Sequence, residues 1–268
     1  MKKSCFAILF LVAGALGLAG LPGGTVGGET AAAQEVAVPP VPSPDLYAGS
    51  PYLRELRNSL VYGEIWERPQ LSKRDRSLIT IAVLQALTRE ELAIHIPRGL
   101  DNGLTPEEIS EIILHVTFYA GWPTGVQASL TAAAAFEERG LTLGDLPRAP
   151  APDTEVTTPS GLSDAYRAVP RLGALRNSLL YGNIWERPLL SKRDRSLVTV
   201  AVNQSLYVTN ELRLHIDRAL DQNGVTPQEL SEVILHVNFY AGWPAAVNAG
   251  RLLTAALEAR GLSFDELQ

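Results

Sequence analysis

The sequence predicts an all-α protein that contains two tandem copies of one helical unit. Residues 56–76, LRNSLVYGEIWERPQLSKRDR, return at 175–195 with three changes, and 110–123, SEIILHVTFYAGWP, return at 231–244 with two. Helix-start motifs and helical spacing of apolar residues occupy both copies, and neither copy shows a strand pattern with turns and a pairing partner. A duplication of this kind indicates one folding unit present twice, so we expect the copies to form a pseudo-dimer.

The N-terminal 33 residues read as a secretory signal peptide. Lys2 and Lys3 precede an apolar stretch from Cys5 to Leu21, and the small residues 30–33 offer a cleavage site before Gln34. An uncleaved membrane anchor is the alternative, but the apolar stretch is short for a span and rich in glycine. We therefore expect an exported protein, periplasmic or secreted, with no stable membrane insertion after cleavage.

Pro-, Ala- and Ser-rich stretches divide the rest of the chain. We expect a flexible arm at 34–50, the first repeat at 51–146, a linker at 147–163 and the second repeat at 164–268.

Composition excludes two classes of function. The chain has 268 residues, of which 46% are apolar and 19% charged, and a net charge of −6 argues against a nucleic-acid partner. Cys5, the single cysteine, lies in the predicted signal peptide, so the mature chain would have neither a disulfide nor thiol chemistry.

Capping motifs locate the helices of each repeat. Ser72 and Asp75 fit an S-x-x-D cap before the apolar run 78–84, which is typical of a buried central helix. The next helix is expected over 91–102, with a left-handed stop at Gly103. Thr105-Pro106-Glu107-Glu108 predicts a helix start, and two further helices are expected to end at Gly121 and at Gly140.

All four histidines fall in matching segments, and each follows a glutamate by four residues. This spacing puts both side chains on one helix face, where a carboxylate can orient an imidazole and raise its pKa for proton transfer. The candidate catalytic residues are His95, Glu91, His215, Glu211, His115 and His236, with Glu111 and Glu232 preceding the last two. Two other interpretations stay open: structural pairs within a helix, and a metal site, although di-iron bundles use a spacing of three. We predict no metal.

Recurring arginines and aromatic residues are candidates for substrate binding. Arg98 follows His95 by three residues, so a guanidinium fork beside the imidazole suits a ligand that carries a carboxylate. Pairing with acidic residues, and packing of the aromatic rings, are the structural alternatives. The candidates are Arg98, Arg218, Arg76, Arg195, Tyr119, Tyr240, Trp122 and Trp243.

Three combined motifs identify a family. The segments L-S-x-R-D-R-S-L-x-T-x-A, E-L-x-x-H followed by N-G-x-T-P-x-E-x-x-E, and H-V-x-F-Y-A-G-W-P resemble the carboxymuconolactone decarboxylase family over both repeats. The resemblance implies the all-helical fold of alkylhydroperoxidase D-like proteins. The peroxidase branch of that fold uses a Cys-x-x-C pair, but Glu91 and Glu211 stand where the second cysteine would be, which argues against peroxidase or peroxiredoxin activity.

The decarboxylase branch keeps Glu-Leu-x-x-His, as both repeats do. The resemblance implies a cofactor-independent lyase or isomerase in which arginine holds a carboxylate while His95 or His215 moves a proton at carbon. A non-catalytic periplasmic protein of the same fold, binding small acids or serving assembly, is the alternative. Six single units in a family ring would correspond to three tandem chains, so we expect a homotrimer.

The two copies differ beside the histidines. Pro97, expected to bend its helix, corresponds to Asp217, and Leu84 corresponds to Asn203; the second repeat also has one extra residue in 207–210. We expect both pockets to form and to differ; the alternative is that one of them is degenerate.

Overall fold

A computed structural model describes residues 46–144, 164–265 and 267. The predicted signal peptide, most of the arm and the linker lie outside these residues. The described helices are α1 (Pro51–Leu56), η1 (Arg57–Val61), η2 (Ile65–Glu67), α2 (Lys73–Ala86), α3 (Leu92–Asp101), α4 (Pro106–Ala120), α5 (Trp122–Glu138), α6 (Asp164–Arg167), α7 (Pro170–Leu175), η3 (Arg176–Tyr181), η4 (Ile184–Glu186), α8 (Lys192–Ser205), α9 (Thr209–Asp221), α10 (Pro227–Ala241) and α11 (Trp243–Glu258).

The described residues contain no strand, which confirms the predicted all-α class. They also contain no helix with the length and apolar character that crossing a membrane would require.

The helices begin at the capping residues that the sequence motifs predict. The Ser72 hydroxyl accepts the Asp75 N–H at 3.0 Å, and Ser191 caps α8 in the same way. Thr105 and Glu108 form a reciprocal capping box at the start of α4. The predicted glycine stops are confirmed, because Gly103 (φ 98°) and Gly121 (φ 95°) both have positive φ.

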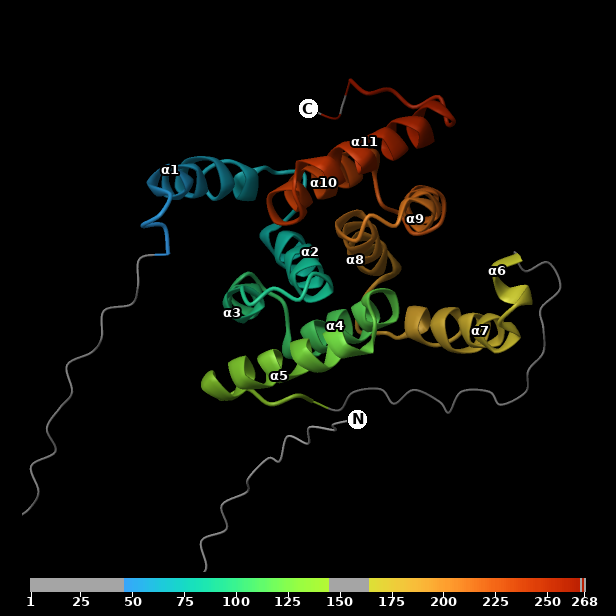
Figure 1. The fold of residues 1–268 in the computed structure, drawn as a ribbon, viewed down its shortest axis with the longest axis horizontal. Coiled ribbons are helices and arrows are strands. Elements are labelled where there is room, and N and C mark those ends of the chain that lie inside the picture. The colour runs from blue at the N-terminus through green and yellow to red at the C-terminus, as the bar shows by residue number, and fades with distance from the viewer. Residues whose placement is uncertain (1–45, 145–163, 266, 268) are drawn as a thin grey trace, which may run out of the picture. The chain divides into compact units, whose positions relative to one another are not determined.

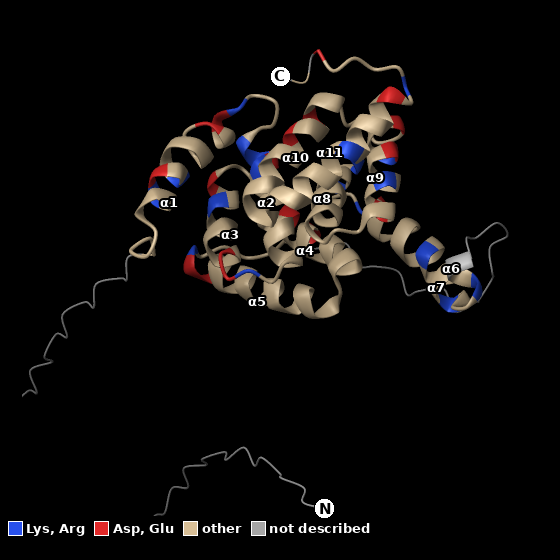
Figure 2. Cartoon of the chain, turned by 45° about the horizontal axis from the view of Figure 1, so that its top comes forward, with Lys and Arg blue, Asp and Glu red and all other residues tan. Residues whose placement is uncertain are grey.

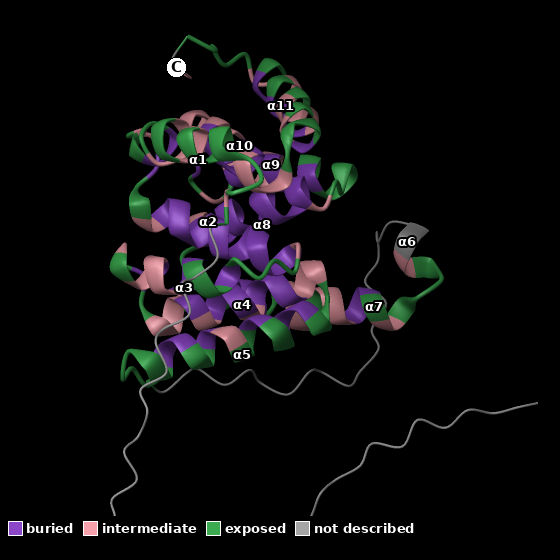
Figure 3. Ribbon diagram, turned by 60° about the vertical axis from the view of Figure 1, so that its left-hand side comes forward, coloured by how far each residue is buried: buried purple, intermediate pink, exposed green. Residues whose placement is uncertain are grey.

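Helices α2 and α8 form the centre of the molecule and pack against each other (Figure 1). Every residue from Asp75 to Ala86 is buried, as Figure 3 shows, which explains why the run 78–84 is apolar on all sides. Helix α2 also contacts α4 of its own repeat and α10 of the other, and α8 does the reverse. Helices α5 and α11 cover the outer sides of α4 and α10. The repeats therefore share one core.

The first helices of each repeat lie against the other repeat. Leu53 on α1 and Phe239 on α10 line one cavity, and α1 lies beside the second repeat (Figures 1 and 3). Phe118 on α4 likewise shares a cavity with Arg176 of η3. Each of these cavities is therefore built from both copies, as the predicted pseudo-dimer requires.

Buried ion pairs join the repeats on both sides of α2 and α8. The Arg76 guanidinium, 0% exposed, donates to the Glu232 carboxylate of α10 at 2.9 Å, and Arg68 donates to the same carboxylate at 2.9 Å. Figure 2 shows basic and acidic positions close together on the ribbon around α2 and α10. On the other side, Arg187 and Arg195 hold Glu111. A buried charge without its partner is costly, so these pairs fix how the repeats dock.

We expect Glu232→Gln to lower the free energy of unfolding by about 3 kcal/mol, because the variant leaves the buried Arg76 guanidinium beside a neutral amide. Urea denaturation measures this. Glu138→Gln, at an exposed position on α5, is the matched control and should change stability by less than about 0.5 kcal/mol. Equal effects in the two variants would contradict a docking role for the pair.

Candidate functional site

One pocket contains His95 and is built from several segments of both repeats, including α1. His95 and Glu91 come from the start of α3, Arg57 from η1, Leu84 from the end of α2 and Tyr240 from α10. The cavity measures about 510 Å³, which is a size that suits a small-molecule ligand. We call it the His95 pocket.

Aromatic rings surround the His95 imidazole. The Trp66 ring stacks on it with centroids 6.2 Å apart, and the Tyr240 ring meets it edge-on at 5.6 Å. The Trp66 indole N–H donates to the Tyr240 hydroxyl at 3.1 Å, which ties η2 of one repeat to α10 of the other. Burial raises the pKa of Tyr240, so its hydroxyl stays protonated and can donate a hydrogen bond.

The second repeat contributes an equivalent pocket around His215, with a volume of about 590 Å³. The Trp185 ring stacks on His215 at 5.8 Å, Tyr119 of α4 meets it edge-on at 5.4 Å, and the Trp185 N–H donates to the Tyr119 hydroxyl at 2.9 Å. Arg176 and Glu211 also line this cavity. We call it the His215 pocket.

The other two histidines lie behind the pockets. His236 is 0% exposed, and its Nε2 lies 2.9 Å from the Thr80 hydroxyl while its Nδ1 faces the Arg76 guanidinium at 3.3 Å. Because a guanidinium only donates, Nδ1 must accept and the ring must be neutral. His115 is held in the same way by Thr199 and Arg195. Their burial speaks against direct contact with a ligand, contrary to the catalytic role expected from sequence.

The expected glutamate–histidine hydrogen bonds do not form. Glu91 lines the pocket with His95, but the only hydrogen bond between them joins the His95 backbone N–H to the Glu91 carbonyl oxygen, and the buried His95 Nδ1 has no partner among the described residues. His215 Nδ1 is likewise without a partner. Glu111 and Glu232 bind arginines of the opposite repeat instead of the histidines on their own helices.

The predicted rise in histidine pKa is wrong in direction. Burial, and after it the nearby Arg98 charge, lower the pKa of His95 to about 4. Burial and the charges of Arg218 and Arg176 lower the pKa of His215 to about 3. With little carboxylate contact to offset desolvation, the neutral imidazole is favoured in both pockets.

The arginines separate into buried and pocket-lining groups. Arg76 and Arg195 are 0% exposed and committed to glutamates, so the substrate contact predicted for them does not fit their burial. Arg98 hydrogen-bonds the Tyr62 hydroxyl and lies over its ring, in a groove next to the pocket. Arg57 lines both that groove and the His95 pocket. It is therefore better placed than Arg98 to meet a carboxylate there.

The aromatic candidates also separate into residues that line the histidine pockets and residues that do not. Tyr240 and Tyr119 line the histidine pockets of the opposite repeats, as described above. Trp122 and Trp243, which begin α5 and α11, are 69% and 70% exposed and do not line either histidine pocket. In the described part of the chain, no three His, Cys, Asp or Glu side chains gather as a metal site would require.

The helix that carries the histidine begins differently in the two repeats. Thr88 (φ 53°) and Tyr207 (φ 60°) both turn the chain after the central helix. The extra residue of the second repeat then lets α9 begin at Thr209, before Glu211, whereas α3 begins at Leu92, after Glu91. Pro97 is accommodated within α3. Of the expected differences between the copies, the extra residue thus changes where the histidine helix begins.

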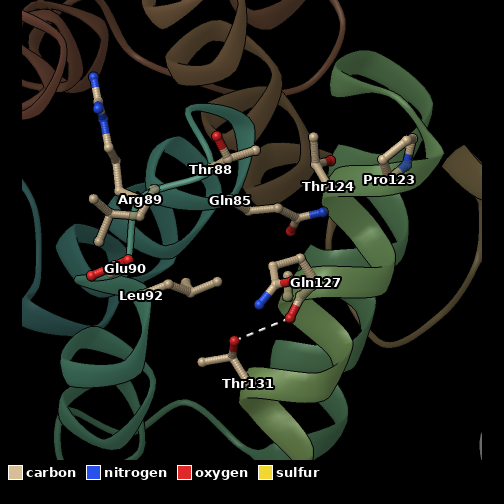
Figure 4. Close-up of a pocket in the computed structure, with 11 residues that line it drawn as sticks. Gln85, Thr88, Arg89, Glu90, Leu92, Pro123, Thr124, Gln127 and Thr131 are labelled. Carbon is tan, nitrogen blue, oxygen red and sulfur yellow. Dashed lines mark hydrogen bonds between the residues drawn. The ribbon is translucent and has the colours of Figure 1, made fainter. Parts of the chain in front are cut away.

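A separate groove lies between α2, α3 and α5. Figure 4 shows Gln85, Gln127 and Thr131 around it, while Arg89 points away from them. Arg89 also lines the His95 pocket. The side chain thus belongs to the mouth of the histidine pocket more than to this groove.

Tyr62, Thr80, Trp66 and Arg57 were not assigned to the site from sequence. Each is identical in the second copy, as Tyr181, Thr199, Trp185 and Arg176. Such identity also holds for residues that only pack, so it could not single them out. Arg57 and Arg176 do sit in π-helical turns, which often mark functional sites, but this conformation is not visible in sequence.

Stability should fall as the pH drops from about 6.5 towards 4, because unfolded histidine (pKa 6.5) takes up a proton that folded His95 and His215 do not. Above pH 6.5 these two groups should contribute no pH dependence. The expected slope is about 1 kcal/mol per pH unit for each histidine, measured by urea denaturation. His95→Gln/His215→Gln should remove the share of these two histidines and leave the share of His115 and His236, whose pKa values burial also lowers; an unchanged slope would contradict neutral imidazoles at His95 and His215.

Comparisons with known proteins match both repeats to one family. The model of the carboxymuconolactone decarboxylase family matches residues 51–135 and again 170–255. A 4-carboxymuconolactone decarboxylase from Acinetobacter baylyi is 46% identical over 81 residues, which are 30% of this chain and 60% of the relative. A nitrosuccinic acid decarboxylase from Metarhizium robertsii is 33% identical over 78 residues, 29% of this chain and 54% of the relative.

The chain thus spans little more than half the length of these curated relatives. The family model, in contrast, covers most of the chain, and its two matches coincide with the two halves that share the α2–α8 core. The chain belongs to the carboxymuconolactone decarboxylase family.

Proposed function

We propose that this protein is a cofactor-independent decarboxylase of small carboxylic acids, with one reaction centre in each histidine pocket. The observation that carries the proposal is the placement of a neutral imidazole, a protonated tyrosine and an arginine around one small cavity. Both curated relatives are named as decarboxylases of carboxylic acids, which supports the same reaction class here.

Arg57 and Arg176 are the proposed carboxylate-binding residues. Each guanidinium lies 4.7 Å from the ring centroid of a tyrosine, Tyr62 or Tyr181, which restrains it at the edge of its pocket. Arg98 and Arg218 lie over the same two tyrosine rings, at 4.7 and 4.6 Å from their centroids. They add positive potential without lining the cavity, so we assign them a positioning role.

His95 and His215 are the proposed proton donors to carbon. A bound carboxylate would supply the negative charge that these pockets lack, raise the imidazole pKa and let the ring take up a proton from solvent. Loss of CO₂ leaves its bonding electron pair on the substrate carbon, where an adjacent electron-withdrawing group delocalises it. The imidazolium then transfers its proton to that carbon.

Tyr240 and Tyr119 complete this arrangement as hydrogen-bond donors. Each hydroxyl accepts a tryptophan N–H and also has a threonine partner, Thr80 or Thr199, and in this proposal it donates its own proton to an oxygen that gains negative charge. Glu91 and Glu211, at the pocket walls, would help bring protons to the imidazoles from solvent.

His95→Gln/His215→Gln should abolish CO₂ release, because it removes both proposed proton donors. We suggest 4-carboxymuconolactone and nitrosuccinic acid as first substrates, with CO₂ measured directly and folding checked by circular dichroism. Trp122→Phe, at an exposed position, is the control and should keep full activity. Full activity in the folded double variant would exclude this mechanism, and tight binding without CO₂ release by the unaltered protein would favour a non-catalytic acid-binding protein.

We also propose that the protein is exported and assembles as a homotrimer, in which three tandem chains supply six repeats. Light scattering should then give about three times the mass of one processed chain, where the full chain is 28.9 kDa. A mass equal to one chain would contradict the trimer.

A further inference from the structure

The two histidine pockets differ in polarity at two wall positions, while a third difference, Val61 against Leu180, is apolar in both. Leu84 and Arg89 line the His95 pocket, whereas their counterparts Asn203 and Val208 line the His215 pocket. Other wall residues recur in both pockets, including the arginine, the glutamate and the tyrosine. A difference in ligand preference must therefore arise mainly from these two positions.

Arg89 adds a cation to the His95 pocket. It follows α2 on the exposed turn that begins at Thr88, and Figure 4 shows its side chain directed away from the neighbouring groove. No hydrogen bond or ion pair engages its guanidinium among the described residues. The pocket thus has two guanidinium groups, Arg57 and Arg89, against the single carboxylate of Glu91.

The His215 pocket has one cation fewer and one buried amide more. Arg176 and Glu211 both line this pocket, and Val208 stands where the His95 pocket has Arg89. Asn203 is 3% exposed, and its buried Nδ2 has no hydrogen-bond partner in the described residues. An unpaired buried amide costs about 1–3 kcal/mol, so a ligand group that hydrogen-bonds it is favoured. Leu84 offers no such group.

We propose that the pockets take different acids: the His95 pocket a dicarboxylate, and the His215 pocket a monocarboxylate that carries a neutral hydroxyl or carbonyl group. This inference rests on the proposed function, in which Arg57 or Arg176 holds the reacting carboxylate. Arg89 then meets the second carboxylate, and Asn203 meets the neutral oxygen. One chain would thereby process two related acids.

Fluorine NMR of the full chain labelled with 5-fluorotryptophan can observe each pocket separately. Of the four tryptophans, Trp66 lies 6.2 Å from His95 and Trp185 lies 5.8 Å from His215, while the exposed Trp122 and Trp243 serve as internal references. Succinate and 4-hydroxybutyrate are matched probes, because they have the same chain length and differ by a carboxylate in place of a hydroxymethyl group.

Succinate should shift the Trp66 resonance at about fivefold lower concentration than the Trp185 resonance, and 4-hydroxybutyrate should show the reverse order. Arg89→Val should remove the succinate preference at Trp66 and leave Trp185 unchanged. Asn203→Leu should remove the 4-hydroxybutyrate preference at Trp185 only. Arg251→Val, which removes one exposed charge on α11, is the matched control and should change neither.

The outcomes separate this inference from the proposed function. If both acids bind both pockets equally, or if the Arg89 and Asn203 variants keep the original preferences, different specificity is excluded while acid binding stands. If neither acid shifts Trp66 or Trp185 at millimolar concentrations, the proposed acid-binding function fails together with the inference.

Discussion

The buried arginine–glutamate pairs between the repeats are the constraint on which the rest of the structure depends. Arg76 is fully buried, and its charge is compensated by Glu232, a residue of the other copy. Because neither charge can be buried alone without a large cost, the two copies must dock with α2 against α10 and α8 against α4. The same docking brings Tyr240 to His95 and Tyr119 to His215.

This arrangement gives the four histidines two different tasks. His236 and His115 accept from buried guanidiniums and donate towards threonine hydroxyls, so they belong to the docking network. His95 and His215 each keep a ring nitrogen without a partner in the described part of the chain, and they line cavities that both copies build. The chemistry that we propose therefore depends on docking, because each cavity takes its arginine and imidazole from one copy and its tyrosine from the other.

Much of the fold follows from local patterns. Caps such as Ser72 and Thr105, and stops such as Gly103 and Gly121, act through neighbouring backbone groups, so their positions can be predicted from sequence. The site was predicted less well. His95, Glu91 and Tyr240 do meet, but the expected Glu91–His95 hydrogen bond is absent, and Arg57 rather than Arg98 lines the pocket. Helical spacing shows which residues share a face, but not which face is buried or what lies opposite.

The sequence by itself determined the duplication, the all-α class, the helix ends and the family, since these depend on residues close together in the chain or on the motifs themselves. Only the tertiary structure decided which side chains pair with each other. Glu232 could have paired with His236 four residues later, but its carboxylate lies between Arg68 and Arg76 of the other copy, where two guanidinium groups outweigh one neutral imidazole. The direction of the histidine pKa shifts was decided in the same way, because burial by residues far away in the sequence outweighs a glutamate one helical turn away.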